Sequence, residues 1–324
     1  MTGSKESSRF SINGKPLEAA DYVATSMQLA MLLELSAYPK PGNVHRTRDH
    51  EDMRYENFLG TISALYMAFF KAAECGWRRT YEGRIGKLIF KGAERMLNWQ
   101  SDGNTSLGTI ILLTPLAVAA GRSLKNGGFK GFAKRFRAEV VNVCRRANFQ
   151  DSLWLFKAIK LVRPGGLGKV QELDVHDPSA LRRIGKERIP LNEIFYLSAR
   201  YDSIALEWVT GFKITFEVGY PFYMEALQRH GDLNVAAVNT FLKILSEKPD
   251  TLIARKAGLN QAIDVSRDAR KILEEGGAST SKGMSLLWSL DEKLRSRGHE
   301  LNPGTTADLT CSSIAVATLS GVRP

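Results

Sequence analysis

Apolar side chains recur at helical spacing along most of this sequence, and the breaks between the apolar runs fall at proline and glycine. Residues 17–37 show none of the alternation that half-buried strands have, and the run stops where Pro39 and Pro41 prevent a helix from continuing. From about residue 52 to 75, Phe58, Ile62 and Leu65 mark one face of a second helix. The pattern therefore predicts two long helices joined by a proline-rich turn.

The same pattern predicts helices over 82–99, 105–120, 131–147, 151–161 and 306–319, and between 191 and 302 helices interrupted near Gly211, Gly231 and Pro249. The 105–120 segment is apolar nearly all round, which places it at the centre of the protein. The run 212–218 alternates and is compatible with a strand, but one strand cannot form a sheet. Residues 169–190 are charged and irregular, so we expect a long surface loop or lid there.

These elements predict an all-α fold, a single large multi-helix bundle around a central apolar helix. Residues 1–16 are polar and are expected to be loose. Residues 17–324 show no repeat or shift in composition that would mark a boundary, so we interpret them as one domain. Hydrophobic residues make up 44% of the 324, which is enough for one substantial core.

The sequence predicts neither a membrane span nor a secretory signal. The longest apolar stretch, 110–120, contains Thr114 and Pro115 and is too short to span a bilayer. No positively charged start followed by an apolar run precedes residue 9. The three cysteines lie far apart and form no metal-type pair, so we expect reduced core residues in a cytoplasmic protein.

Lysine and arginine outnumber the acids by 45 to 34, and the resulting net charge of +11 favours anionic partners. Phosphorylated metabolites, nucleic acid and a membrane surface all fit this charge. The basic segment 131–147 would suit nucleic acid only if its aromatic side chains were exposed. Phe132 and Phe136 lie at helical spacing and are more simply explained as core, so we favour small phosphorylated ligands.

Glu34 is the only charged residue between Asp21 and Lys40, on a helix whose other side chains are mostly apolar. A carboxylate in such surroundings must meet a metal, a cation or a hydrogen-bonding network, because an unpaired buried charge is very costly. A structural ion pair would satisfy it as well as a ligand would. We favour a binding site in which Glu34 is a metal ligand.

The turn after this helix carries groups suited to phosphate. Lys40, His45 and Arg46 supply polar or cationic side chains, the prolines stiffen the backbone, and Gly42 allows a close approach to a ligand. An ordinary connection between helices would have a similar composition. We predict that Lys40, Gly42, His45 and Arg46 bind phosphate.

Acidic residues lead into the second helix. Asp52 and Glu56 stand one turn apart on one face, a placement that can hold Mg²⁺ through oxygen ligands and leave waters to contact phosphates. Acids in a first helical turn are also favoured by the helix dipole, so capping is the alternative explanation. His50 is placed either to transfer protons or to form a hydrogen bond within the turn.

Two further helix starts, at 103–106 and 302–306, resemble each other physically. Free backbone N–H groups and the positive end of the helix dipole make such starts anion sites, although helix capping alone would explain the same residues. Asp308, in the first turn of the last helix, is predicted to hold a metal beside the phosphates. The predicted phosphate-binding residues at these starts are Asn104, Thr105, Gly304, Thr305 and Thr306.

Taken in order, these segments form a set of motifs: Glu34, Pro39-Lys40-Pro41-Gly42, His50-x-Asp52-Met53, Asn104-Thr105, Asn302-Pro303-Gly304 and Ala307-Asp308-Leu309. The set resembles the triphosphoribosyl-dephospho-CoA synthase family, in a divergent, archaeal-type branch. The motifs run from about residue 30 to 310, so the resemblance covers nearly the whole chain. Each motif is short, and together they are fairly specific.

The resemblance implies that domain 17–324 is catalytic, a pentosyl transferase that joins ATP and 3′-dephospho-CoA and releases adenine. The acceptor's 2′-hydroxyl would attack C1′ of the ATP ribose, and nearby carboxylates would stabilise the positive charge that develops on the sugar. Mg²⁺ would be held by some of Glu34, Asp52 and Asp308 and would neutralise the triphosphate. Asp52 or Asp151 would take the acceptor's proton, and His50 is the third candidate catalytic residue.

Three differences from the family bear on the acceptor. His45 stands where bacterial members usually carry aspartate, Thr305 and Thr306 replace smaller residues, and the 164–219 stretch is unlike theirs. We therefore expect the ATP site to resemble the family's more closely than the acceptor site does. A related alcohol is then an alternative acceptor.

Two other classes of function stay open. One is another nucleotide- or cofactor-metabolising enzyme on the same scaffold, a hydrolase or phosphotransferase, which would form ADP or AMP rather than adenine. The other is a non-catalytic RNA-binding protein that uses the +11 charge and whose affinity would fall steeply with salt. A homo-oligomer is compatible with the sequence.

Overall fold

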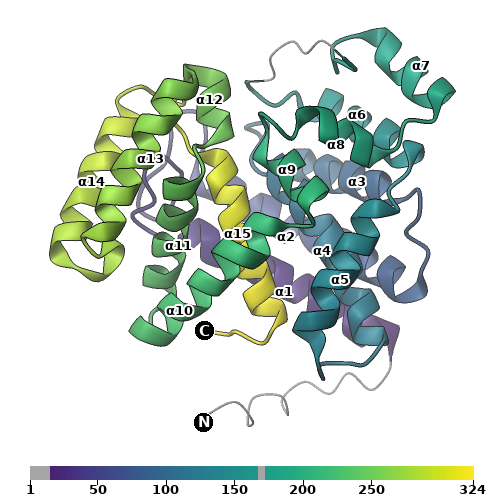
Figure 1. Ribbon diagram of the computed structural model, residues 1–324, viewed down its shortest axis with the longest axis horizontal. Coiled ribbons are helices and arrows are strands. Elements are labelled where there is room, and N and C mark those ends of the chain that lie inside the picture. Colours follow the sequence, from purple (N-terminus) through teal and green to yellow (C-terminus); the bar gives the residue numbers. More distant parts are fainter. Residues whose placement is uncertain (1–14, 167–171) are drawn as a thin grey trace.

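The computed structural model describes residues 15–166 and 172–324, and over these residues the long elements are all helices (Figure 1). This confirms the predicted all-α class. The segment 1–16, predicted to be loose, lies almost entirely outside the described residues. The elements are α1 (Pro16–Ser36), α2 (Tyr55–Arg78), α3 (Ile85–Asn98), α4 (Leu107–Lys125), α5 (Phe132–Arg145), α6 (Phe149–Val162), α7 (Pro178–Glu187), α8 (Leu191–Ser198), α9 (Ser203–Thr210), η2 (Ile214–Gly219), α10 (Tyr220–His230), α11 (Leu233–Glu247), α12 (Thr251–Ala257), α13 (Leu259–Glu274), η3 (Gly277–Ser279), α14 (Ser281–Arg295) and α15 (Gly304–Leu319).

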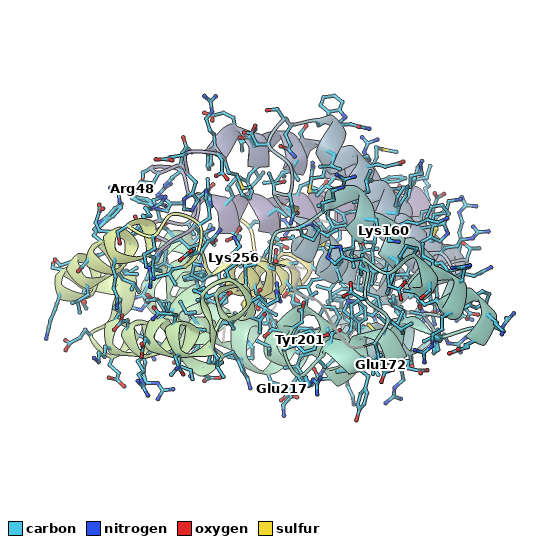
Figure 2. All side chains as sticks on the ribbon, turned by 90° about the horizontal axis from the view of Figure 1, so that it is seen from above. Arg48, Lys160, Glu172, Tyr201, Glu217 and Lys256 are labelled. Atoms are coloured by element: carbon cyan, nitrogen blue, oxygen red, sulfur yellow. The ribbon has the colours of Figure 1, made fainter. Side chains whose placement is uncertain are left out.

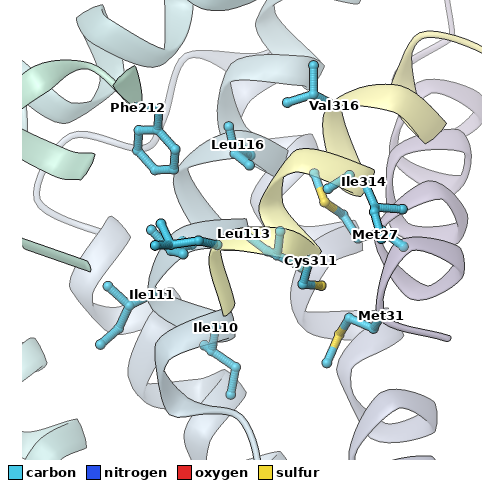
Figure 3. Close-up of a cluster of buried hydrophobic side chains, with 14 of the residues drawn as sticks. Met27, Met31, Ile110, Ile111, Leu113, Leu116, Phe212, Cys311, Ile314 and Val316 are labelled. Carbon is cyan, nitrogen blue, oxygen red and sulfur yellow. The ribbon is translucent and has the colours of Figure 1, made fainter. Parts of the chain in front are cut away.

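Helix α4 lies at the centre, as its uniform apolarity predicted. Most of its side chains are buried, and it packs against α1, α2, α5 and α15. Figure 3 shows Met27 of α1, Leu113 and Leu116 of α4, and Ile314 of α15 in one cluster. The helix is longer than the predicted 105–120 and could cross a membrane by length and composition, but 89% of its most apolar window is buried inside the protein. Its apolarity is therefore explained by its place in the core.

The first and last helices lie side by side. The Tyr22 hydroxyl of α1 donates to the carbonyl oxygen of Leu319 at 3.0 Å, and the Thr318 hydroxyl of α15 donates to the carbonyl oxygen of Ser26 at 2.9 Å. In Figure 1, α10 to α14 lie on one side of this central layer, and α3 and α6 to α9 lie on the other. The packing of α1 on α15 brings motifs from the two ends of the sequence together.

Pro115, inside α4, has no N–H to bond the carbonyl of Ile111 one turn earlier. The indole N–H of Trp208, on α9, donates to that carbonyl at 3.3 Å, so the buried oxygen keeps a partner. Trp208 is itself buried and leans against Phe195 of α8, with ring centroids 4.8 Å apart. A single side chain thus compensates for the proline and ties α9 to the central helix.

The alternating run 212–218 is helical, so the possibility of a strand was wrong. Residues Ile214–Gly219 form a π-helical segment between α9 and α10. The buried carboxylate of Glu207 accepts the backbone N–H groups of Ile214 at 2.7 Å and of Thr215 at 2.8 Å. These two N–H groups, at the start of the π-helical segment, are therefore bonded by a side chain and need no neighbouring strand.

The stretch 169–190, predicted to be a long surface loop or lid, contains helix α7, so the prediction of a loop was wrong for residues 178–187; residues 169–171 lie outside the described residues. Asp177 caps α7 by accepting the backbone N–H of Ser179 at 2.7 Å. Ala180 and Ile184 on α7 pack against Phe156 and Ile189 in a small second cluster. Only two buried apolar side chains mark this helix, too weak a pattern to stand out from the charges around it.

The basic helix α5 turns its aromatic side chains inward. Phe132 and Phe136 are buried, with ring centroids 5.1 Å apart, whereas Lys134 is exposed. This confirms the prediction that its aromatics belong to the core, and removes the exposed aromatic face that an RNA-binding helix would need.

Replacing Trp208 by phenylalanine should destabilise the protein by roughly 1–3 kcal/mol, because the carbonyl of Ile111 would be left buried without a donor. Urea denaturation followed by circular dichroism measures this difference. Trp99→Phe is the matched control, since Trp99 is 62% exposed and should change stability by less than about 0.5 kcal/mol. Equal midpoints for the two variants would contradict the role assigned to Trp208.

Candidate active site

A cavity of about 1280 Å³ lies between the two helix groups, bounded by α1, α4, α6, α8, α9, α12 and α15. Figure 2 labels Lys256, Tyr201 and Glu172, which belong to its walls. More than half of the residues predicted from the sequence line it, namely Glu34, Lys40, Asp52, Asn104, Thr105, Gly304, Thr305 and Asp308. The predicted residues outside its lining are Gly42, His45, Arg46, His50, Asp151 and Thr306.

Asp308 of α15 packs directly against the start of α4. A Cβ on Gly108 would lie 2.0 Å from its Oδ2 atom, so only glycine allows this approach. The Thr109 hydroxyl donates to Oδ1 of the same carboxylate. Burial raises the pKa of Asp308 to about 7, the nearby carboxylates of Glu34 and Asp250 act in the same direction, and the hydrogen bonds from Thr109 oppose them.

Glu34, near the end of α1, forms an ion pair with Lys40. The Lys40 ammonium is almost fully buried and also donates to the backbone carbonyl of Glu34 at 2.9 Å. The carboxylate predicted to need a partner therefore has one, supplied by the turn that follows its own helix. Because both side chains line the cavity near Asp308, they form with it a charged floor at the junction of α1, α4 and α15.

The two helix starts predicted to bind phosphate already hold carboxylates. At α15, the buried Asp250 accepts both the backbone N–H and the hydroxyl of Thr306 at 2.7 Å. At α4, Asp308 occupies the first turn, and Asn104 accepts the N–H of Leu107 at 3.0 Å. The carboxylates of Asp250 and Asp308 therefore occupy positions at these helix starts that a phosphate would otherwise take. Thr306 is thus committed to Asp250, which corrects its expected role.

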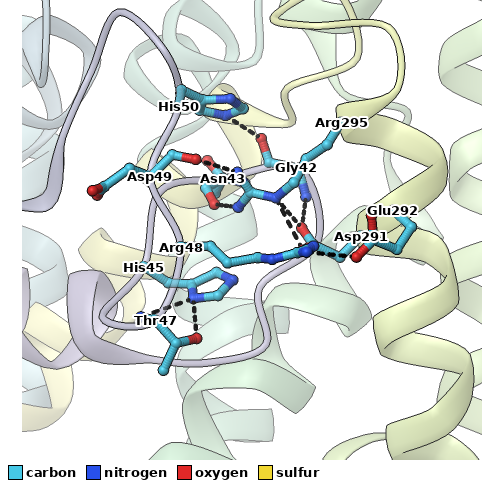
Figure 4. A network of polar contacts seen from close by, with 10 residues as sticks. All are labelled: Gly42, Asn43, His45, Thr47, Arg48, Asp49, His50, Asp291, Glu292 and Arg295. Atoms are coloured by element: carbon cyan, nitrogen blue, oxygen red, sulfur yellow. Dashed lines mark hydrogen bonds and ion pairs between the residues drawn. The ribbon is translucent and has the colours of Figure 1, made fainter.

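The turn 37–54 is anchored to α14 by a buried carboxylate (Figure 4). Asp291 accepts the Gly42 N–H at 2.8 Å, an Arg48 guanidinium N–H at 2.9 Å and the Arg295 Nε–H at 2.8 Å. Arg295 also donates to the backbone carbonyl of Asp49 at 2.7 Å. The turn is thus held to α14 by two of its own donors, Gly42 and Arg48, and by the bond that Arg295 makes to Asp49.

Three residues of this turn serve its packing rather than the cavity. Gly42 has φ +73°, and a Cβ there would lie 3.0 Å from both Leu294 and Pro303. His45 is fully buried, its ring bonds Thr47, and burial lowers its pKa to about 3, so it stays neutral. Arg46 is exposed and stacks over the Tyr38 ring at 3.9 Å. These positions leave Gly42, His45 and Arg46 outside the predicted phosphate site.

Asp151 also lies away from the cavity. Its fully buried carboxylate accepts the Gly86 N–H at 2.9 Å and the Asn148 N–H at 2.8 Å, which joins the start of α6 to the start of α3. A carboxylate held by backbone donors at the far end of α6 has no access to a ligand in the cavity. Asp151 therefore lies where it cannot accept a proton from a ligand in the cavity, contrary to the prediction.

Asp52 lies at the cavity wall, paired with a histidine that the sequence did not single out. Its carboxylate contacts Nε2 of His299, in the loop before α15. The His50 ring lies against the His299 ring, with centroids 4.1 Å apart and the planes tilted by 45°, and its Nε2 bonds the Gly42 carbonyl at 3.0 Å. Burial lowers the pKa of His50 to about 4, so it stays neutral beside His299.

Four further cations line the cavity and were missed from the sequence: Arg163, Arg200, Arg255 and Lys256. Lys256 donates to the carbonyl of His299 at 3.1 Å, and burial lowers its pKa. Arg255 pairs with Asp202 at 3.2 Å. They come from three separate parts of the chain, so no local motif could mark them.

Comparison with known proteins assigns this site to a family. The profile of the ATP:dephospho-CoA triphosphoribosyl transferase family matches residues 20–323. The chain belongs to this family. It is therefore an enzyme of the triphosphoribosyl-dephospho-CoA synthase type, a transferase, as the motifs indicated.

Individual relatives agree with the family match. A 2-(5''-triphosphoribosyl)-3'-dephosphocoenzyme-A synthase from Klebsiella pneumoniae is 25% identical over 303 residues, covering 91% of this chain and 89% of its own. A relative from Salmonella choleraesuis, carrying the same name as a probable assignment, is 31% identical over 86% of this chain and 85% of its own. A crystal structure assigned to the same enzyme, from Archaeoglobus fulgidus, is 29% identical, with a TM-score of 0.60 over 82% of this chain and 100% of its own.

The three acids predicted to share a magnesium ion do not form one ligand set in this transferase. Glu34 and Asp308 lie near each other, but Asp52 is paired with His299 instead. Across residues 15–166 and 172–324, no group of three or more histidine, cysteine or acidic side chains is arranged to hold a metal ion. A protein-bound magnesium site built from Glu34, Asp52 and Asp308 therefore does not fit this arrangement.

Gly108→Ala should destabilise this transferase by about 1–3 kcal/mol, because the added methyl would collide with the Asp308 carboxylate. Gly185→Ala is the matched control: a Cβ there meets nothing within 4 Å, and alanine in the middle of α7 should be neutral or slightly stabilising. Chemical denaturation of both variants measures the difference. A Gly108→Ala protein as stable as the control would show that the contact with Asp308 is not close.

Asp308→Asn should become more stable relative to wild type as the pH rises from 5 to 8. Because the folded pKa of Asp308 is raised to about 7, ionising it costs the folded state stability across this interval, and a neutral amide avoids that cost. Thermal melts of both proteins at several pH values test this. A melting-temperature difference that does not change with pH would contradict the raised pKa.

Proposed function

We propose that this chain transfers the 5-triphosphoribosyl group of ATP to the 2′-hydroxyl of 3′-dephospho-CoA and releases adenine. The observation that supports it most is the charged floor of Glu34, Lys40 and Asp308 in a cavity of about 1280 Å³, within a chain of this family. Ligand pockets usually measure about 300–1,000 Å³, so this cavity is large enough for a donor and an acceptor together.

Apolar as well as charged side chains line the cavity, which suits two nucleotide substrates. The apolar side chains that α6, α8 and α9 contribute are Leu155, Phe156, Ile159, Val162, Ile194, Phe195 and Ile204. Purine rings and the pantetheine arm of dephospho-CoA present surfaces that such side chains bind well.

Two buried amide groups also favour a polar ligand. Asn43 Nδ2 and Asn302 Oδ1 are buried, and neither has a hydrogen-bond partner among the described residues. Both side chains line the cavity. Because buried polar atoms are nearly always bonded, ribose or phosphate oxygens and hydroxyls are natural partners for them.

The floor carries two carboxyl groups in different states, which suits departure of a purine from a sugar. Glu34 is ion-paired with Lys40 and places a negative charge where C1′ becomes cationic. Asp308, with its pKa raised to about 7, is protonated in a substantial fraction of molecules at neutral pH and can protonate the departing adenine. The C1′–N9 bond breaks with its electron pair going to adenine, and the acceptor oxygen bonds to C1′.

The triphosphate is assigned to the basic wall of the cavity, since the helix starts of α4 and α15 already hold Asp308 and Asp250. Arg255 and Lys256 on α12, with Arg163 and Arg200, supply the positive charge. Magnesium would enter with the triphosphate rather than in a site made by the protein, and no step of the proposed reaction depends on it.

Incubation of the purified protein with ATP and dephospho-CoA should release adenine and form one product carrying the triphosphoribosyl group. Chromatography with mass spectrometry measures both. Formation of ADP or AMP instead would indicate a phosphotransferase or hydrolase and would overturn the proposal.

Asp308→Asn should lower the rate of adenine formation about 100-fold or more, because the amide cannot supply a proton. Asp264→Asn, at an exposed position on α13, makes the same chemical change away from the cavity and should keep wild-type activity. A rate for Asp308→Asn within a few-fold of that control would contradict the role of Asp308.

A further inference from the structure

A carboxylate–histidine pair lies at the cavity wall, apart from the charged floor. Asp52, in the loop before α2, contacts Nε2 of His299, in the loop before α15. Both residues line the cavity. The His299 side chain is 30% exposed, and its Nδ1 has no hydrogen-bond partner among the described residues, so that nitrogen is available to a ligand.

The loop around His299 is fixed on two sides. The ring of His50 lies against the ring of His299 at a tilt of 45°, and His50 is itself held by its bond to the Gly42 carbonyl at 3.0 Å. On the other side, the Lys256 ammonium donates to the backbone carbonyl of His299 at 3.1 Å. An imidazole held in one orientation, with one nitrogen bonded to a carboxylate and the other open, has the geometry of a general base.

Stability does not explain this pair. The Asp52 side chain is 70% exposed, and ion pairs with exposed partners contribute little to folding. Among the three catalytic residues predicted from the sequence, Asp151 is structural, and His50 uses its Nε2 in a backbone hydrogen bond. The reaction needs a proton acceptor for the attacking hydroxyl. In the charged floor, Glu34 is assigned to the cationic sugar and Asp308 to the departing adenine, so neither is that acceptor.

We propose that His299 accepts the proton of the acceptor's hydroxyl group and that Asp52 is its positioning residue. The inference rests on the proposed function. As the hydroxyl oxygen bonds to C1′, its O–H bond breaks and the proton moves to Nδ1 of His299. The Asp52 carboxylate, on Nε2, stabilises the imidazolium that forms. Adenine leaves with the electron pair of the C1′–N9 bond, and the proton on His299 passes to solvent after product release.

The charges around His299 come from four elements. Asp52 contacts the ring from the turn before α2, neutral His50 lies against it from the same turn, and Lys256 of α12 bonds the backbone carbonyl of His299. Two further charges lie one residue away: Arg295, at the end of α14, acts on His50, and Glu300 acts on Lys256. Asp52 is the acid in direct contact with the ring. Removing that carboxylate should therefore withdraw the negative charge that stabilises the imidazolium.

His299→Asn should lower the turnover number for adenine release about 100-fold or more and leave the thermal stabilisation by ATP unchanged. Added imidazole should restore part of the rate. His230→Asn, exposed on α10, is the matched control and should behave as wild type. An active wild type with a His299→Asn rate within a few-fold of this control would overturn the inference.

Asp52→Asn changes an exposed side chain, so it should fold normally, and it provides the second test. We expect a turnover number about 10-fold to 100-fold lower and an acid limb of the pH–rate profile that moves to lower pH. A lower rate with an unmoved pH profile would mean a merely structural role and would overturn the inference. A wild type that releases no adenine at any pH would refute the proposed function itself, a result distinct from both.

Discussion

The site depends on a carboxylate buried where two helices meet. Asp308 enters from α15 and lies against the start of α4, in a space that exists only because residue 108 has no side chain beyond its Cα hydrogen. Burial beside Glu34 makes ionisation of Asp308 costly, and its hydrogen bonds with Thr109 offset only part of that cost. The packing of α1, α4 and α15 in the rest of the core has to offset this free-energy cost. The apolar surface of α4, buried on nearly every side, contributes most of the stabilisation that offsets it.

The same arrangement recurs around the cavity: a buried carboxylate receives several donors and fixes the element that presents the next functional group. Asp250 holds the first turn of α15 through Thr306 and thereby fixes Asp308 two residues further on. Asp291 holds the turn that carries Lys40. The donors offset part of the cost of burying such carboxylates, and removing the donors would leave unpaired buried charges. The family's short motifs therefore combine ligand-facing residues with residues that keep those in position.

The division within the motifs explains why several predicted roles shifted. In Pro39-Lys40-Pro41-Gly42, Lys40 reaches the cavity while Gly42 packs against Leu294 and Pro303. At the start of α15, Thr305 faces the cavity and Thr306 faces Asp250. Neighbouring residues at a helix start point in different directions, so membership of a motif does not decide which side a residue serves.

The sequence by itself determined the helical class, the central place of α4, the approximate bounds of α1 to α6 and of α15, and the family, because helical spacing, prolines and short ordered motifs are local properties of the chain. It also indicated Glu34, Asp52 and Asp308 as unusual acids. Only the tertiary structure decided their partners: Glu34 meets Lys40, Asp52 meets His299, and Asp308 meets Gly108 and Thr109. The basic wall of the cavity was likewise invisible, since its arginines and lysine lie up to about a hundred residues apart. A charged residue in an apolar segment of the sequence indicates that it needs a partner. Which residue is that partner depends on how helices distant in the sequence pack.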